Sequence, residues 1–140
     1  MPSLQQRLRF NLSLWLAARI LPFRVGQRPL DRVLALAEPV RTGRFHGLPP
    51  GYISEHVLRT TRHPWLMRKR RCLRQGLLGY RFLAEAGFCP ELHFGVDFRS
   101  LRTGDEKAHC WVSLDGVSVV NDRMENMSTV LVHSSKGRME

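Results

Sequence analysis

Residues 107–122 read Lys-Ala-His-Cys-Trp-Val-Ser-Leu-Asp-Gly-Val-Ser-Val-Val-Asn-Asp, and this stretch decides the fold. Polar and apolar side chains alternate on both sides of Asp115-Gly116, a dipeptide typical of a two-residue turn between antiparallel strands. The stretch therefore predicts a β-hairpin with strands over 107–114 and 117–121. With unbroken pairing around this turn, Val112 faces Val119 and His109 faces Asp122, with Cβ atoms about 4.5–5.5 Å apart. A three-residue loop would bring Asn121 closer to His109 instead.

The residues on either side of the hairpin predict the rest of the sheet. Residues 91–97 alternate in the same way and predict a strand, while 98–106 are polar and predict a loop. Residues 128–133 are β-branched and apolar and predict a further strand. The last residues, 135–140, predict a disordered tail.

The first half of the chain has helical periodicity. We predict helices over 3–21, ended by Pro22; over 29–38, stopped by Pro39; over 54–62, capped by Ser54; and over 72–86, with Gly87 at the C′ position. Residues 41–51, rich in glycine and proline, predict a loop. Helices followed by one long helix and an antiparallel meander indicate the α+β class.

Composition limits the class of protein. The chain has 140 residues, a net charge of +10, 43% hydrophobic residues and three cysteines. This is an ordinary globular composition of single-domain length, and the cysteines are too few for a disulfide scaffold, so we expect a cytoplasmic protein. Residues 1–74 hold 15 Lys and Arg against three acids, whereas residues 75–140 are nearly neutral. The first half therefore predicts a surface for an anionic partner.

The most apolar stretch is too short to span a membrane. It runs from Phe10 to Phe23, 14 residues, and contains Arg19; a spanning helix needs about 20 apolar residues. We expect a helix packed on the domain's own core. The alternative is an interfacial helix over 3–21 that contacts a membrane surface through Trp15, its leucines and its arginines.

Three residues could form a nucleophilic site. Cys72 is expected in the first turn of its helix, where Arg70, Arg71, Arg74 and the helix dipole favour thiolate over thiol. His109 could act as the base, and Asp122, across the hairpin, could orient it. Each residue also has a structural interpretation, because a buried Cys or a strand His is more often a core or surface residue.

The remaining cysteines do not suggest a metal site. Cys89 precedes a proline at a turn, and Cys110 is expected on the opposite strand face from His109, so both are interpreted as structural. The Cys and His residues lack the paired short spacings of a zinc site. We also find no glycine-rich phosphate loop, so neither a metal nor a cofactor is predicted.

Four segments together resemble a known family. They are Arg71-Cys72-Leu73-Arg74, residues 91–96, Ala108 to Gly116 and Val120-Asn121-Asp122. Their combination is similar to the transglutaminase-like cysteine protease of lasso peptide biosynthesis, in its stand-alone form as the leader peptidase half of a split B protein. The close part of the resemblance covers about residues 60–122. It implies a papain-like or transglutaminase-like core in which Cys72, His109 and Asp122 form the catalytic triad.

The resemblance also implies a reaction and partners. The enzyme would cut the leader from a ribosomally made precursor, with backbone N–H groups at the start of the Cys72 helix as oxyanion donors and Gln75 as a further candidate. It would act with a separate leader-recognition protein and an ATP-dependent macrolactam synthetase. The corresponding organisation is a basic helical region over 1–55 and a protease core over 56–134.

Two other functions remain open from the sequence. One is acyl transfer to an amine on the same fold. The other is a non-catalytic basic adaptor that binds nucleic acid or anionic membrane through residues 1–74. No nucleic-acid-binding motif supports that adaptor, so we do not expect nucleic acid as a partner.

Overall fold

The computed structural model describes residues 3–25, 35, 37, 45, 47–62, 71–97, 107–121 and 128–134. In these ranges the helices are α1 (Leu4–Val25), α3 (Pro50–Thr60) and α4 (Arg71–Glu85). The strands are β1 (Glu91–Asp97), β2 (Lys107–Leu114), β3 (Val117–Val120) and β4 (Ser128–Ser134). The predicted helix over 29–38, apart from Ala35 and Ala37, the tail over 135–140 and Asp122 lie outside the described residues.

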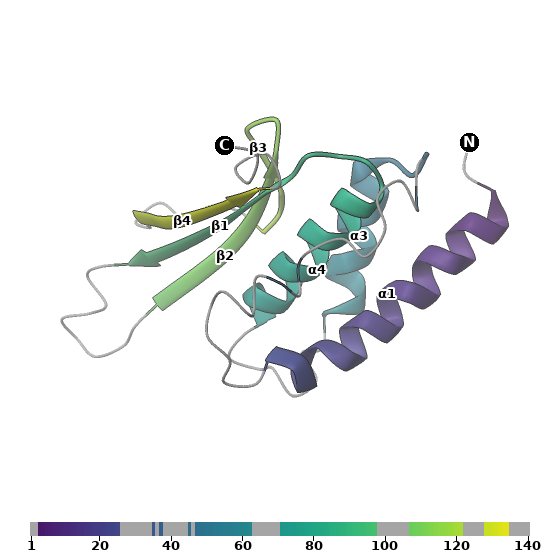
Figure 1. Ribbon diagram of the computed structural model, residues 1–140, viewed down its shortest axis with the longest axis horizontal. Helices are drawn as coiled ribbons and strands as arrows, with labels where there is room; N and C mark the ends of the chain where they lie inside the picture. The colour runs from purple at the N-terminus through teal and green to yellow at the C-terminus, as the bar shows by residue number, and fades with distance from the viewer. Residues whose placement is uncertain are drawn as a thin grey trace.

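The strands form one antiparallel sheet in the order β3-β2-β1-β4. The α+β class is therefore confirmed, but β4 pairs with β1 and does not continue a meander beyond β3. A fourth strand that returns beside the first is the Greek-key order. The sheet lies on one side of the molecule and the helices on the other, with α4 in contact with β2, α3 and α1 (Figure 1).

The hairpin turn is as predicted, but its register is not. Asp115 and Gly116 both have positive φ, 53° and 83°, as a type I′ turn requires. Leu114 pairs with Val117, but Val112 pairs with Val120, because a β-bulge after the turn adds one residue to β3. The prediction that Val112 faces Val119 is wrong, and the unbroken ladder that set His109 opposite Asp122 is broken.

Helix α4 ends as predicted and packs tightly on the sheet. Gly87 has a φ of +98°, Phe88 N–H donates to the Leu83 carbonyl and Gly87 N–H to that of Ala84, which is a Schellman cap. A Cβ at Gly79 would lie 2.7 Å from Val120 Cγ2. The glycines of α4 therefore let the helix approach the sheet more closely than any larger residue would.

Helix α1 continues through Pro22 to Val25, so the prediction that Pro22 ends it is wrong. Proline has no N–H and cannot donate to the carbonyl four residues before it, here that of Ala18. Instead, Nη2 of the buried Arg74 side chain donates to the Ala18 carbonyl at 2.7 Å. A donor from α4 thus replaces the missing backbone donor and joins the two helices.

Helix α1 is apolar on two faces. Its inner face is packed on the core, as predicted, through Phe10, Leu14, Ala18 and Leu21. Its outer face carries exposed apolar side chains, namely Leu4, Leu8, Leu12, Trp15, Leu16, Ile20 and Phe23. None of the helices in the described ranges is long and apolar enough to cross a bilayer.

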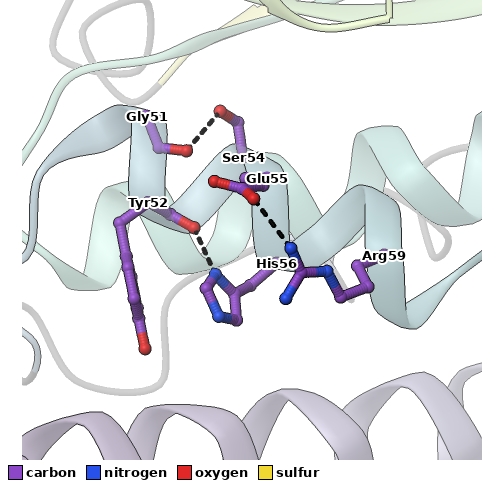
Figure 2. A network of polar contacts seen from close by, with 6 residues as sticks. All are labelled: Gly51, Tyr52, Ser54, Glu55, His56 and Arg59. Carbon is purple, nitrogen blue, oxygen red and sulfur yellow. Dashed lines mark hydrogen bonds and ion pairs between the residues drawn. The ribbon is translucent and has the colours of Figure 1, made fainter.

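Helix α3 begins at Pro50, four residues before the predicted cap at Ser54. Proline is favoured in the first helical turn because its φ is preset and its missing N–H needs no partner there. Ser54 Oγ donates to the Gly51 carbonyl, and His56 Nδ1 lies 2.9 Å from the Tyr52 carbonyl (Figure 2). The rings of Tyr52 and His56 lie 4.0 Å apart and both contact Phe10 of α1, so this polar network has a structural role.

Candidate active site

Cys72 is the second residue of α4, and its side chain is half-buried. The adjacent Arg71 is exposed, and its guanidinium donates to the Arg62 carbonyl at 3.3 Å. Arg74 points to α1 instead, where burial and then the nearby Arg19 guanidinium lower its pKa. Of the arginines expected around Cys72, Arg74 therefore has another role, and Arg70 lies outside the described residues.

Cys110 faces α4 directly behind Cys72. Its Sγ occupies the space that a Cβ at Gly76 would need, and its Cβ would lie 3.5 Å from that atom. The side chain is 2% exposed. Burial, and to a smaller extent the Cys72 thiol beside it, hold the pKa of the Cys110 thiol well above its usual range. Cys110 therefore remains a neutral thiol at physiological pH.

Asn121 connects the two cysteines. It follows β3 with a φ of +59°, a left-handed conformation that asparagine tolerates better than most residues. Its Nδ2 donates to the Cys110 carbonyl at 3.0 Å and lies 3.5 Å from the Cys72 carbonyl. One side-chain amide therefore holds the start of α4 against β2.

His109 lies in a row of rings on β1 and β2. Its ring stacks on Trp111 with centroids 5.9 Å apart, and Trp111 stacks on His93 at 5.2 Å with an interplanar angle of 2°. His93 Nε2 lies 2.7 Å from Ser113 Oγ. Trp111 is 3% exposed, so its fixed ring orients the imidazole of His109.

The sheet separates part of the predicted triad. Side chains alternate along a strand, so Cys110 faces α4 and Cys72, whereas His109 and Trp111 leave from the opposite face of β2. The Cys72 carbonyl lies 3.5 Å from Asn121 Nδ2, and the Cys72 side chain packs against the core beneath α4. The structure thus brings Cys72 to the strand that carries His109 but does not place both side chains on one face. Asp122 lies outside the described residues.

The edge of β2 beside His109 is the side on which Asn121 contacts this strand. Among the described residues β3 pairs with β2 only over Val112 to Leu114, so Ala108 to Cys110 have no paired strand on that side. Asn121 reaches the Cys110 carbonyl across this edge. Asn121 therefore occupies this edge beside Cys110, while the His109 ring remains stacked on Trp111 on the other face of β2.

Sequence reasoning missed several residues of this region. Asn121 appeared only as the alternative to Asp122, and its positive φ and its two carbonyl contacts depend on the bulge. The link from Arg74 to Ala18 could have been sought, because a proline inside an apolar helix leaves one carbonyl without a donor. Trp111 and His93 share a face by simple alternation, which was visible in the sequence.

The arrangement supports nucleophilic chemistry at a cysteine. A half-buried thiol in the first turn of a helix lies near the backbone N–H groups that have no partner within the helix and that can stabilise an oxyanion. An imidazole on the adjoining strand can transfer protons. These are the elements that acyl transfer through a thioester requires.

Comparison with known proteins agrees with this fold. Residues 8–133 match the sequence profile of the transglutaminase-like superfamily, from α1 to β4. No curated protein and no solved structure matches the chain significantly. Because the profile covers most of the chain, the protein belongs to the transglutaminase-like superfamily.

Proposed function

We propose that this protein is a cysteine peptidase that cleaves the leader from a ribosomally synthesised lasso precursor peptide, with Cys72 as nucleophile, His109 as general base and acid, and Asp122 as the group that orients His109. Cysteine peptidases and transglutaminases both occur in the superfamily. The observation that carries the proposal is the position of Cys72, half-buried in the first turn of a helix that packs on the His109 strand.

The reaction proceeds in two steps on these residues. The Cys72 thiolate attacks the carbonyl carbon of the last leader residue, and the C–N bond breaks as the His109 imidazolium protonates the leaving amine. This amine is the new N-terminus of the core peptide. Water, deprotonated by His109, then attacks the thioester carbonyl and releases the leader as a carboxylic acid. Backbone N–H groups at the start of α4 stabilise the oxyanion in both steps.

The reaction requires the His109 ring to reach Cys72 Sγ around the open edge of β2. In enzymes without substrate, catalytic hydrogen bonds are often long and tighten only in the complex. A peptide that lies along this edge would contact both Cys72 and His109. Among the described residues no strand pairs with Ala108 to Cys110 on this side, although the Cys110 carbonyl accepts from Asn121. The same position suits a substrate delivered in extended form, because such a peptide can add to a strand edge through main-chain hydrogen bonds.

The proposed partners are the precursor, a separate leader-recognition protein and an ATP-dependent macrolactam synthetase. Support for a docking partner comes from the outer face of α1. Seven large apolar side chains there are exposed, and α1 carries Arg7, Arg9 and Arg19 without any acidic residue. An anionic surface, on a protein or a membrane, would complement this charge.

The test is precursor cleavage by matched cysteine variants, followed by mass spectrometry. The wild-type chain and a Cys89→Ala control, altered at an exposed thiol after the end of α4, should release the leader in the presence of the recognition protein. The Cys72→Ala variant should bind its partners and leave the precursor whole. Cleavage by Cys72→Ala at the wild-type rate would refute the proposal. The mass of the released leader separates transfer from hydrolysis, since a peptidase gives the leader carboxylic acid without an added amine, whereas an acyltransferase needs an amine acceptor and gives the leader amide.

A further inference from the structure

The packing of α4 on β2 brings two cysteines from distant parts of the chain together. Cys72 and Gly76 are four residues apart on α4 and share one helix face, with Cβ positions about 5–6 Å apart. Cys110 Sγ fills the space beside Gly76 on this face, where Leu92 Cδ1 would lie 3.1 Å from a Cβ. The Cys110 sulfur is therefore within about one helical turn of Cys72.

Asn121 gives an independent measure of this proximity. Its Nδ2 lies 3.0 Å from the Cys110 carbonyl and 3.5 Å from the Cys72 carbonyl, so a single nitrogen contacts the backbone of both residues. The contact joins the start of α4 to the unpaired edge of β2. Cys72 is near the N-terminus of α4, and its side chain packs against the core on the same side as Cys110.

The two thiols differ in exposure. Cys72 is half-buried and can meet a small oxidant, whereas Cys110 is 2% exposed and is shielded from solvent by α4. The third cysteine, Cys89, is exposed and follows the end of α4, so that most of the length of the helix separates it from Cys72. Only Cys110 is therefore placed to react with an oxidised Cys72 in the same molecule.

We propose that Cys72 and Cys110 form a reversible disulfide, which makes the candidate nucleophile a site of oxidative modification by hydrogen peroxide. The effect of this disulfide on catalysis rests on the proposed function, whereas the formation of the disulfide does not. The disulfide would occupy Cys72 Sγ and block acyl transfer. It would also protect the sulfur from irreversible oxidation to the sulfinic acid.

The chemistry has two balanced steps. The Cys72 thiolate attacks one peroxide oxygen, an S–O bond forms, the O–O bond breaks and hydroxide leaves, which gives a sulfenic acid. The sulfur of Cys110 then attacks Cys72 Sγ, an S–S bond forms, and the S–O bond breaks. The hydroxyl leaves as water with the proton of the Cys110 thiol. A dithiol reductant reverses the bond by two exchange steps.

The experiment maps disulfides in the purified full-length protein. The chain is treated with hydrogen peroxide, free thiols are blocked with N-ethylmaleimide, and the protein is digested without reduction for mass spectrometry. We expect a cross-linked peptide pair containing Cys72 and Cys110, lost after dithiothreitol, in both the wild type and Cys89→Ala. In Cys110→Ala, Cys72 should instead accumulate as sulfenic acid, trapped with dimedone, and then as sulfinic acid.

Two results would overturn the inference. One is oxidation of Cys72 to the sulfinic acid at the same rate in wild type and Cys110→Ala, with Cys110 recovered as its maleimide adduct. The other is a cross-link from Cys72 to Cys89. The activity arm is separate: oxidised wild type should regain leader cleavage after dithiothreitol, and oxidised Cys110→Ala should not. If the protein formed the Cys72–Cys110 cross-link but its reduced form did not cleave the precursor, the disulfide inference would stand and the proposed peptidase function would be refuted.

Discussion

Arg74 takes over a hydrogen bond that Pro22 cannot make. Its guanidinium, buried between α4 and α1, donates to the Ala18 carbonyl, which lacks the backbone donor normally supplied four residues later. Buried hydrogen bonds matter most when their loss leaves a polar group unpaired. This single side chain therefore lets α1 continue past a proline and fixes α1 to the helix that carries Cys72.

A double-mutant cycle tests this substitution of one donor for another. Arg74→Met should lower the free energy of unfolding by about 1–3 kcal/mol, because the Ala18 carbonyl loses its donor. In a Pro22→Ala background the cost should be smaller, since the backbone N–H at position 22 can then donate to that carbonyl. Urea unfolding of the four proteins measures both values. Equal costs in the two backgrounds would contradict the assignment.

Cys110 should make stability depend on alkaline pH. Its folded pKa is raised, so its contribution to stability is present below the unfolded thiol pKa, about 8.5, and is lost as the pH rises above it. Between pH 7 and pH 10 the loss amounts to about 2 kcal/mol. Cys110→Ala should therefore lose less stability over this range than wild type does. The matched control is Cys89→Ala, which should follow the wild-type profile; identical slopes for Cys110→Ala and wild type would refute this.

At the residue scale, the sequence predicted the positions of residues on their helices and strands better than it predicted their tertiary contacts. Local periodicity predicted that Cys72 lies near the start of its helix and that the side chain of Cys110 points to the opposite strand face from His109. The position of Cys72 in α4 and the contact of Cys110 with this helix agree with both predictions. The destination of Arg74 depends on a carbonyl 56 residues away. The contacts of Asn121 depend on a bulge. Spacing encodes neither contact: Pro22 indicates that the Ala18 carbonyl needs another donor, but not that Arg74 supplies it.

At the scale of elements, α4 and the sheet depend on small side chains where they meet. Gly76→Ala should destabilise the protein by about 1–3 kcal/mol, because the new methyl group would overlap Cys110 Sγ. Adding Cys110→Ala removes that sulfur and should recover part of the loss. Gly51→Ala is the matched control: the space around Gly51 in α3 is open, so it should be neutral or stabilise by up to about 1 kcal/mol.

Thermal and urea unfolding of these variants give the comparison. Equal stability of Gly76→Ala and Gly51→Ala would contradict the claim that α4 packs against β2 too closely for a side chain at position 76. If Cys110→Ala gave no recovery, the steric cause would be wrong.

The outer face of α1 should act in binding more than in chemistry. Replacing Arg7, Arg9 and Arg19 with Gln should weaken association with the recognition protein or with anionic vesicles, and the remaining binding should depend less on salt. Cleavage of a saturating precursor should persist. The matched control is Arg59→Gln on α3, whose partner is the exposed Glu55. Abolished cleavage with intact binding would contradict this role.

The elements themselves were predictable where their signals are local. Strands β1 and β2 match their predicted bounds because alternation and the Asp115-Gly116 turn are read within a few residues. The end of α1 was misjudged because a distant arginine compensates for Pro22. The start of α3 was misjudged because a proline at its first position, not Ser54, begins the helix. The pairing of β4 with β1 could not be predicted in this way, because the hydrophobic pattern of a strand does not specify which strand it pairs with.

At the scale of the whole molecule, α4 contacts the sheet as well as α1 and α3 (Figure 1), so it connects the candidate site to α1. Asn121 holds the first turn of α4 to β2, and Arg74 holds α4 to α1. The superfamily match spans both parts, from residue 8 to residue 133. The central claim is that Cys72, at the junction of these contacts, forms a thioester with the leader.

Acid-quenched single-turnover digestion tests that claim most directly. The protein, the recognition protein and the precursor are mixed, quenched within seconds and mapped by mass spectrometry. The account predicts a leader adduct on the peptide that contains Cys72, absent in Cys72→Ala, with its formation slowed in His109→Ala. An adduct on Cys89 or Cys110, or cleavage by Cys72→Ala at the wild-type rate, would contradict it.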